Sequence, residues 1–289
     1  MSMSSAPNTI VLIHGLWLSP LSWEHWIERY SRAGFTVLAP AWPGMEGTVG
    51  ELRADTSGFE HLGATEIVDH YAAVIEKLES PPIIMGHSFG GAFTEMLLDR
   101  GLGAAGVAID PAPLKGVLRL PLSSLRSGFP VLRNPANTHR AVMLSAEEFH
   151  YSFTNTLSEE ESAAIYDRYA VPGPGRILFQ AALANFNPHP ATRVDYDNAA
   201  RAPLLIIGGG VDHVVPAAVT QETAEHYRHS KARTEYREFP GRSHFTVGQP
   251  GWEEVADYAL NWAVELAGHG TLVNQESLHG RPLPESSAR

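Results

Sequence analysis

The sequence predicts an α/β fold with a doubly wound, mostly parallel sheet and a mainly helical segment inserted into it. Two observations carry this prediction. Short apolar runs of strand length alternate with helical patterns along most of the chain. Runs that are apolar throughout are typical of parallel strands covered by helices on both faces. One long segment, residues 111–201, breaks the alternation and is rich in Pro, Ser and Arg.

Each expected element has a local justification. The strand runs are short, apolar and closed by glycine or a Pro/Gly turn, and the helices show apolar spacing of three and four residues. The first helix has Ser22 as its cap and Gly34 as its stop. We expect strands at residues 9–15, 35–44, 82–86, 104–110, 203–210 and 233–241. We expect helices at residues 22–34, 65–80, 89–102 and 252–268.

The interruption defines the predicted domain organisation. Residues 1–110 and 202–268 form the two parts of the core, residues 111–201 a cap or lid, and residues 269–289 a polar tail. The stretches "SAEE" and "SEEE" in the insertion are typical of capped helix starts. The length of the insertion favours a lid over the sheet edge, and the alternative is an irregular extension of the core.

Composition excludes several classes of function. The 289 residues carry a formal net charge of −11, which disfavours a nucleic-acid partner. There is no cysteine, so disulfides, thiolate nucleophiles and cysteine metal sites are excluded. The apolar runs are far shorter than the ~20 residues of a membrane span, and the start of the chain lacks a signal-peptide pattern. We expect a cytoplasmic protein with a small-molecule substrate and no nucleic-acid or membrane partner; the oligomeric state stays open.

Ser88 is the candidate nucleophile. It lies in "GHSFG", between an apolar strand and a helix, and fits the pattern G-x-S-x-G. A tight strand-to-helix turn exposes such a serine, and the flanking glycines remove side chains that would clash. A serine hydroxyl is a weak nucleophile at neutral pH. It therefore needs a base, a group that orients the base, and donors for the oxyanion.

Later strand ends supply the missing groups. "FPGRSHF" offers His244 as the base, and "GGGVDHVVP" offers Asp212 as the acid. Asp110, at the end of the preceding strand, is the alternative acid. The oxyanion donors are expected to be the backbone N–H groups of Leu16 and Phe89, with Trp17 as the alternative to Leu16.

These motifs resemble those of the α/β-hydrolase superfamily, in its esterase- and lipase-like branch of serine hydrolases. "VLIHGLW", "APAWPGMEG", "IIMGHSFGG", "GGGVDHVVP" and "FPGRSHF" occur in the expected order. The resemblance implies the α/β-hydrolase fold and a hydrolase of carboxylic esters or lactones that needs no cofactor. Many relatives have Asp before the Pro-Gly turn and His-Gly after it, and "AWPGMEG" has neither.

Several alternatives stay open on the same scaffold. Related triads cleave amides or C–C bonds, form peracids or release cyanide from cyanohydrins, and some related proteins are small-ligand receptors. Aromatic residues in the motif loops and the cap are candidates for an apolar substrate pocket, although core packing is the simpler reading of each. They are Trp17, Phe149, Phe153, Phe186 and Phe245. No local pair of metal ligands accompanies the histidines, so no metal site is expected.

Overall fold

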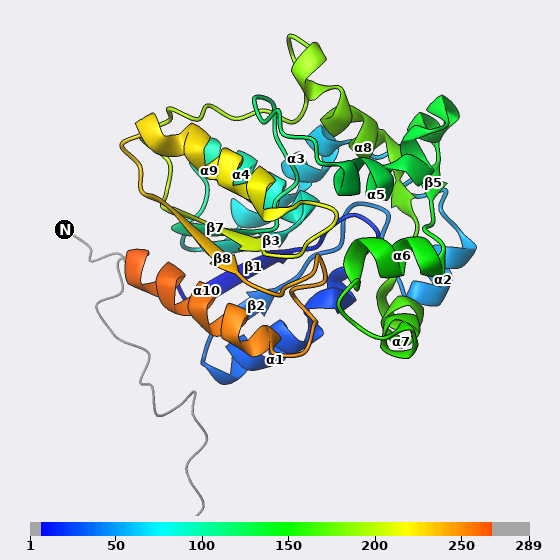
Figure 1. Ribbon diagram of the computed structural model, residues 1–289. Coiled ribbons are helices and arrows are strands. Elements are labelled where there is room, and N and C mark those ends of the chain that lie inside the picture. The colour runs from blue at the N-terminus through cyan, green and yellow to red at the C-terminus, as the bar shows by residue number, and fades with distance from the viewer. Residues whose placement is uncertain (1–6, 268–289) are drawn as a thin grey trace, which may run out of the picture.

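The computed structural model describes residues 7–267 (Figure 1). Six parallel strands form the main sheet in the order β2-β1-β3-β4-β7-β8. All six expected strands are present. They are β1 (Thr9–Ile13), β2 (Thr36–Leu38), β3 (Ile83–His87), β4 (Ala105–Ile109), β7 (Leu204–Gly209) and β8 (Thr234–Phe239). The expected tail, residues 269–289, lies outside the described residues.

The register of the central strands brings their carboxyl ends together. Gly86 of β3 pairs with Ile13 of β1 and with Ala108 of β4. The chain therefore leaves three neighbouring strands at one edge of the sheet. Ligand sites of open parallel sheets form at that edge.

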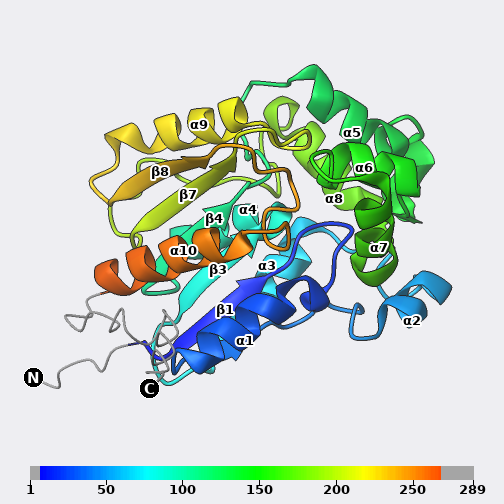
Figure 2. The ribbon, with the colours of Figure 1, turned by 60° about the horizontal axis from the view of Figure 1, so that its bottom comes forward.

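Helices cover both faces of the sheet (Figures 1 and 2). The first face carries α1 (Glu24–Arg32) and α10 (Trp252–Leu266), and the second carries α3 (Ala64–Ile75), α4 (Phe89–Asp99) and α9 (Ala217–His226). The sequence did not predict α9 or the short α2 (Val49–Ala54). Two 3-10 turns, Pro20–Trp23 and Tyr227–His229, complete the core elements.

Residues 111–201 contribute no strand to the main sheet. They form α5 (Leu122–Leu132), α6 (Ala146–Phe153), α7 (Glu159–Tyr169), α8 (Gly175–Ala182) and the 3-10 turns Pro135–His139 and Ala184–Phe186. A short antiparallel pair, β5 (Ala141–Val142) and β6 (Gly173–Pro174), was not expected. Both views show these elements gathered on the side of the sheet away from the C-terminal end of α10 (Figures 1 and 2).

The stretches "SAEE" and "SEEE" begin helices as predicted. Ser145 and Ser158 cap α6 and α7 in capping boxes closed by Glu148 and Glu161. The last residues of the segment 111–201 pack against the core: Val194 and Tyr196 contact the buried cluster around Leu204. Within residues 7–267 no helix has the length and apolar character needed to cross a bilayer.

Candidate active site

Ser88 occupies a strained turn between β3 and α4. Its φ is +55°, in the left-handed region that side chains rarely adopt. The two flanking glycines are sterically required. A Cβ added to Gly86 would lie 1.9 Å from the Gly90 carbonyl oxygen, and one added to Gly90 would lie 2.1 Å from that of Ile13. The turn therefore holds Ser88 at the carboxyl edge of the sheet.

Asp212 and His244 form a buried pair in the loops after β7 and β8. Nδ1 of His244 lies 2.6 Å from Oδ2 of Asp212, and neither side chain is exposed. Oδ1 of Asp212 accepts hydrogen bonds from the N–H groups of Val214 and Val215, at 2.6 and 2.9 Å. The loop backbone thus orients the carboxylate, and the carboxylate orients the imidazole.

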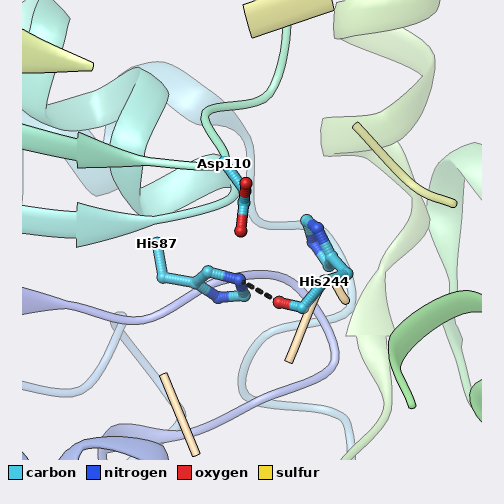
Figure 3. A group of neighbouring side chains, drawn as sticks. All are labelled: His87, Asp110 and His244. Atoms are coloured by element: carbon cyan, nitrogen blue, oxygen red, sulfur yellow. Dashed lines mark hydrogen bonds between the residues drawn. The ribbon is translucent and has the colours of Figure 1, made fainter. Parts of the chain in front are cut away.

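The other ring nitrogen of His244 has no partner. Nε2 is buried and makes no hydrogen bond within residues 7–267. His87, the residue before Ser88, bonds through its Nε2 to the carbonyl oxygen of His244 at 2.7 Å. The turn at Ser88 and the loop of His244 are therefore in direct contact (Figure 3). No hydrogen bond joins Ser88 and His244 in this part of the chain.

Asp110, the alternative acid, also lies beside His244. It follows β4 with a φ of +45°, is fully buried, and its Oδ1 accepts a hydrogen bond from the Gly209 N–H at 2.5 Å. Its Oδ2 has no partner within the described residues. Asp212 is thus the hydrogen-bond partner of Nδ1 of His244, and Asp110 is a neighbour of the pair.

The candidate oxyanion donors are free. Neither the Leu16 N–H nor the Phe89 N–H donates a hydrogen bond to any described residue, and the same is true of Trp17. Trp17 has a φ of +65° and is held by two hydrogen bonds to residues of the segment 111–201. Its Nε1 donates to the Val142 carbonyl at 3.1 Å, and its own carbonyl accepts from the Val171 N–H at 2.9 Å.

The predicted pocket aromatics divide into two groups. Phe149 and Phe153 of α6 are buried and stacked, and the Phe153 ring meets the His244 ring edge-on at 4.8 Å. Phe245 is buried and donates its backbone N–H to the Phe153 carbonyl. Trp17 meets Phe153 edge-on at 6.1 Å. Phe186 does not join this group, because it lies in an outer 3-10 turn with its side chain 85% exposed.

Comparison with known proteins identifies the family. The family model described as alpha/beta hydrolase family matches residues 10–258. The chain belongs to this family. A search of curated protein sequences returned no match.

Solved structures share the fold of this α/β hydrolase at low sequence identity. Monoacylglycerol lipase of Paleococcus ferrophilus is 21% identical with a TM-score of 0.62, covering 90% of this chain and 96% of its own. An extracellular alpha/beta-hydrolase of a Paenibacillus species is 22% identical with a TM-score of 0.63, covering 89% and 99%. A pyrethroid hydrolase of Sphingobium faniae JZ-2 is 16% identical with a TM-score of 0.60, covering 90% and 99%.

Burial sets the protonation of the groups around His244. Desolvation, with the nearby charge of Asp212, raises the pKa of Asp110 well above its usual range, so this carboxyl stays neutral. Desolvation lowers the pKa of His87 well below its usual value and that of His14 to about 4. A neutral His87 imidazole and a neutral Asp110 carboxyl thus lie beside the pair that Asp212 forms with His244.

The same groups are the one set of possible metal ligands found in residues 7–267. His87, Asp110 and His244 each offer an atom within 4.8 Å of the others (Figure 3). His87 and His244 each bond to protein through one ring nitrogen, and burial raises the pKa of Asp110, so a cation at this place would have to displace the proton of the Asp110 carboxyl.

Two supporting contacts were not predicted from the sequence. His213, beside Asp212, bonds through Nδ1 to the Tyr151 carbonyl of α6 at 2.8 Å and so links the loop of Asp212 to α6. The pair β5 and β6 lies against the loop of Leu16 and Trp17, where a Cβ on Gly173 would meet the Leu16 side chain at 2.5 Å. The position of His213 directly after Asp212 could have suggested the first contact. Strands of two residues carry too little pattern to suggest the second.

Proposed function

We propose that this α/β hydrolase is a serine hydrolase that cleaves a carboxylic ester or lactone of a small, largely apolar substrate through an acyl-enzyme on Ser88. One observation carries the proposal: His244 is bonded at Nδ1 to the buried Asp212, and its Nε2 is left without a partner. That is the arrangement a general base needs beside a serine nucleophile.

The proposed acylation begins with proton transfer from Ser88 Oγ to Nε2 of His244. Ser88 then attacks the substrate carbonyl carbon, and the carbonyl π electrons move to oxygen. The N–H groups of Leu16 and Phe89 donate hydrogen bonds to this oxyanion, and the partial positive charge at the N-terminus of α4 stabilises it further. When the intermediate collapses, the bond to the leaving alcohol breaks, and His244 returns its proton to the alcohol oxygen.

Deacylation follows the same route with water. Water gives a proton to His244 and attacks the acyl carbon, and the departing Ser88 oxygen takes the proton back. Asp212 stabilises the imidazolium in both steps, and its two backbone donors keep its other oxygen in place. This mechanism uses no cofactor.

Burial supports an apolar substrate. Ser88 is only 4% exposed, and His244 is fully buried beneath Phe153 of α6. A charged substrate would lose its hydration there without an evident charged partner. The nearly closed arrangement requires movement of the cap for entry of all but the smallest esters. The lipase name of one structural neighbour agrees with this class of substrate.

Initial rates on short-acyl p-nitrophenyl esters test the proposal. Ser88→Ala should remove at least about 99.9% of turnover with the fold intact, because removing a triad member costs a factor of 10³ or more. Ser31→Ala, at an exposed serine of α1, is the matched control and should keep the wild-type rate. A Ser88→Ala enzyme with wild-type rates would eliminate the acyl-enzyme mechanism.

A further inference from the structure

The cap carries an exposed apolar surface on the outside of the molecule. Within residues 7–267, six large hydrophobic side chains are more than half exposed, and all lie between residues 118 and 186. They are Leu118 (73%), Leu120 (63%), Leu122 (84%), Phe129 (60%), Leu183 (55%) and Phe186 (85%). We call these six the apolar cap face. Isolated exposed leucines need no explanation, but a group confined to one part of the fold does.

Helix α5 is amphipathic in the reverse sense. Its inward positions hold Ser127, Gly128 and Val131, which are buried, and its outward positions hold Leu122 and Phe129. Positions 122 and 129 are seven residues apart and therefore share one helix face. The large apolar side chains of α5 thus point toward solvent, and the smaller residues face the core. Packing in the core therefore does not explain why Leu122 and Phe129 are apolar.

The two segments of the apolar cap face adjoin. The Asn185 side chain accepts a hydrogen bond from the Gly116 N–H at 2.7 Å and donates one to the Val117 carbonyl at 2.8 Å. These bonds hold Leu118 beside the turn that carries Leu183 and Phe186. Helices α5 and α8 also pack together. The segments that carry the six side chains are therefore neighbours in the fold.

The segment that carries four of the six side chains has a charge opposite to that of the whole protein. Residues 111–146 contain five Lys or Arg and no Asp or Glu, whereas the whole chain has a net charge of −11. Arg126 in α5 and Arg133 just past its end lie on the side of Leu122 and Phe129 and are exposed, and the Arg126 guanidinium stacks on the Tyr151 ring at 3.7 Å. The positive charge of Arg119 is partly neutralised, because Oε2 of Glu222 lies 3.9 Å from its Nε.

We propose that the apolar cap face docks on an anionic lipid surface. Exposed Leu and Phe side chains flanked by Arg are the features by which an amphipathic helix binds in the plane of such a surface. A second copy of the chain fits less well, because a two-fold contact through this face would bring two basic surfaces together.

The sequence alone did not indicate the apolar cap face. The expectation of no membrane partner depended on the lack of an apolar run long enough to span a bilayer, and docking needs no span. The inward side of α5 bears on the candidate active site, since Ser127 Oγ donates to the His213 carbonyl, next to Asp212, at 3.3 Å. A lipid surface bound by α5 would therefore lie one helix away from the acid loop.

Vesicle co-sedimentation without any ester tests the docking directly. We expect the wild-type protein to bind phosphatidylglycerol vesicles and to bind phosphatidylcholine vesicles only weakly. Binding to phosphatidylglycerol should be lost as NaCl rises from about 0.05 to 0.5 M. Leu122→Ser with Phe129→Ser should weaken binding at least about tenfold, since each side chain buries apolar area. Arg126→Gln with Arg133→Gln should weaken binding to phosphatidylglycerol and remove most of its salt dependence.

Matched controls separate docking from general damage. Leu21→Ser, an exposed leucine outside the cap, and Arg32→Gln with Arg228→Gln, two exposed arginines outside the cap, should bind like wild type. Ser88→Ala should also bind like wild type, so a failure of the proposed chemistry would leave the docking result intact. Absence of phosphatidylglycerol binding at low salt would overturn the proposal. So would a dimer in solution that Leu122→Ser with Phe129→Ser dissociates.

Discussion

Nδ1 of His244 lies 2.6 Å from Oδ2 of Asp212, and neither side chain is exposed to solvent. The pair belongs to the core after the insertion, whereas Ser88 belongs to the core before it. His87 links the two parts through its bond to the His244 carbonyl. A charge that forms on His244 during catalysis would meet the Asp212 carboxylate without intervening water, where attraction between charges is strong.

The two buried aspartates should differ sharply in their effect on turnover. Asp212→Asn is expected to lower kcat about 10³- to 10⁴-fold, because an amide cannot hold the required tautomer of His244. Asp110→Asn should lower kcat less than about tenfold, because burial already keeps the Asp110 carboxyl neutral. Steady-state kinetics on one short-acyl ester at pH 7.5 measure both. The reverse ranking would make Asp110 the acid.

The nucleophile turn should tolerate no Cβ at its glycines. Gly86→Ala is expected to destabilise the protein by more than about 3 kcal/mol, because the new methyl group would overlap the Gly90 backbone. Gly50→Ala, in the exposed helix α2, meets no atom within 4 Å and should stabilise by about 0.5–1 kcal/mol. Urea unfolding gives both values, and equal stability of the two variants would refute the tight turn.

Glu95 should make stability depend on pH. Desolvation raises the pKa of this buried α4 carboxyl to about 8, and the Tyr227 hydroxyl and Arg201 oppose the shift only in part. The folded chain keeps the proton that the unfolded chain loses above about pH 4.5. Stability due to Glu95 is therefore full below about pH 4.5 and falls until about pH 8.

Glu95→Gln should remove that contribution to the slope. Between pH 5 and 9 the variant should lose less unfolding free energy than wild type, by on the order of a few kcal/mol. Glu76→Gln, at an exposed position, serves as the control. Parallel pH profiles for wild type and Glu95→Gln would show that Glu95 ionises normally.

The Trp17 indole should affect turnover by fixing the loop that holds the Leu16 N–H. Trp17→Phe removes the bond from Nε1 to the Val142 carbonyl and frees the loop that holds the Leu16 N–H. We expect kcat to fall about tenfold with little change in KM, as for a loss of transition-state interactions. Trp262→Phe is the control, because its buried Nε1 has no partner to lose. Equal kcat values for both variants would contradict a role for the Trp17 bond.

The sequence predicted the parts of the fold that local pattern determines. The six strands, the turn at Ser88 and the capping boxes of α6 and α7 each follow from apolar runs, glycines or cap residues within a few positions. The sequence offered both Asp110 and Asp212 as acids, because both follow buried strands. Only the tertiary structure shows that Asp212 contacts Nδ1 of His244.

The cap was predicted least well, for physical reasons. Its β5 and β6 pair residues about thirty positions apart, and strands of two residues have no readable period. Phe149 and Phe186 look alike in sequence, yet the first is buried against Phe153 and the second is 85% exposed. Contacts between distant segments decide exposure here, such as those of Asn185 with residues 116 and 117.

Labelling with a fluorophosphonate, followed by peptide mass spectrometry, tests whether Ser88 is the activated nucleophile. Such a reagent reacts with a serine activated by a neighbouring base. We expect a single adduct on Ser88, complete loss of labelling in Ser88→Ala, and much slower labelling in Asp212→Asn. An adduct on another residue, or ester turnover that persists while Ser88 remains unlabelled, would contradict it.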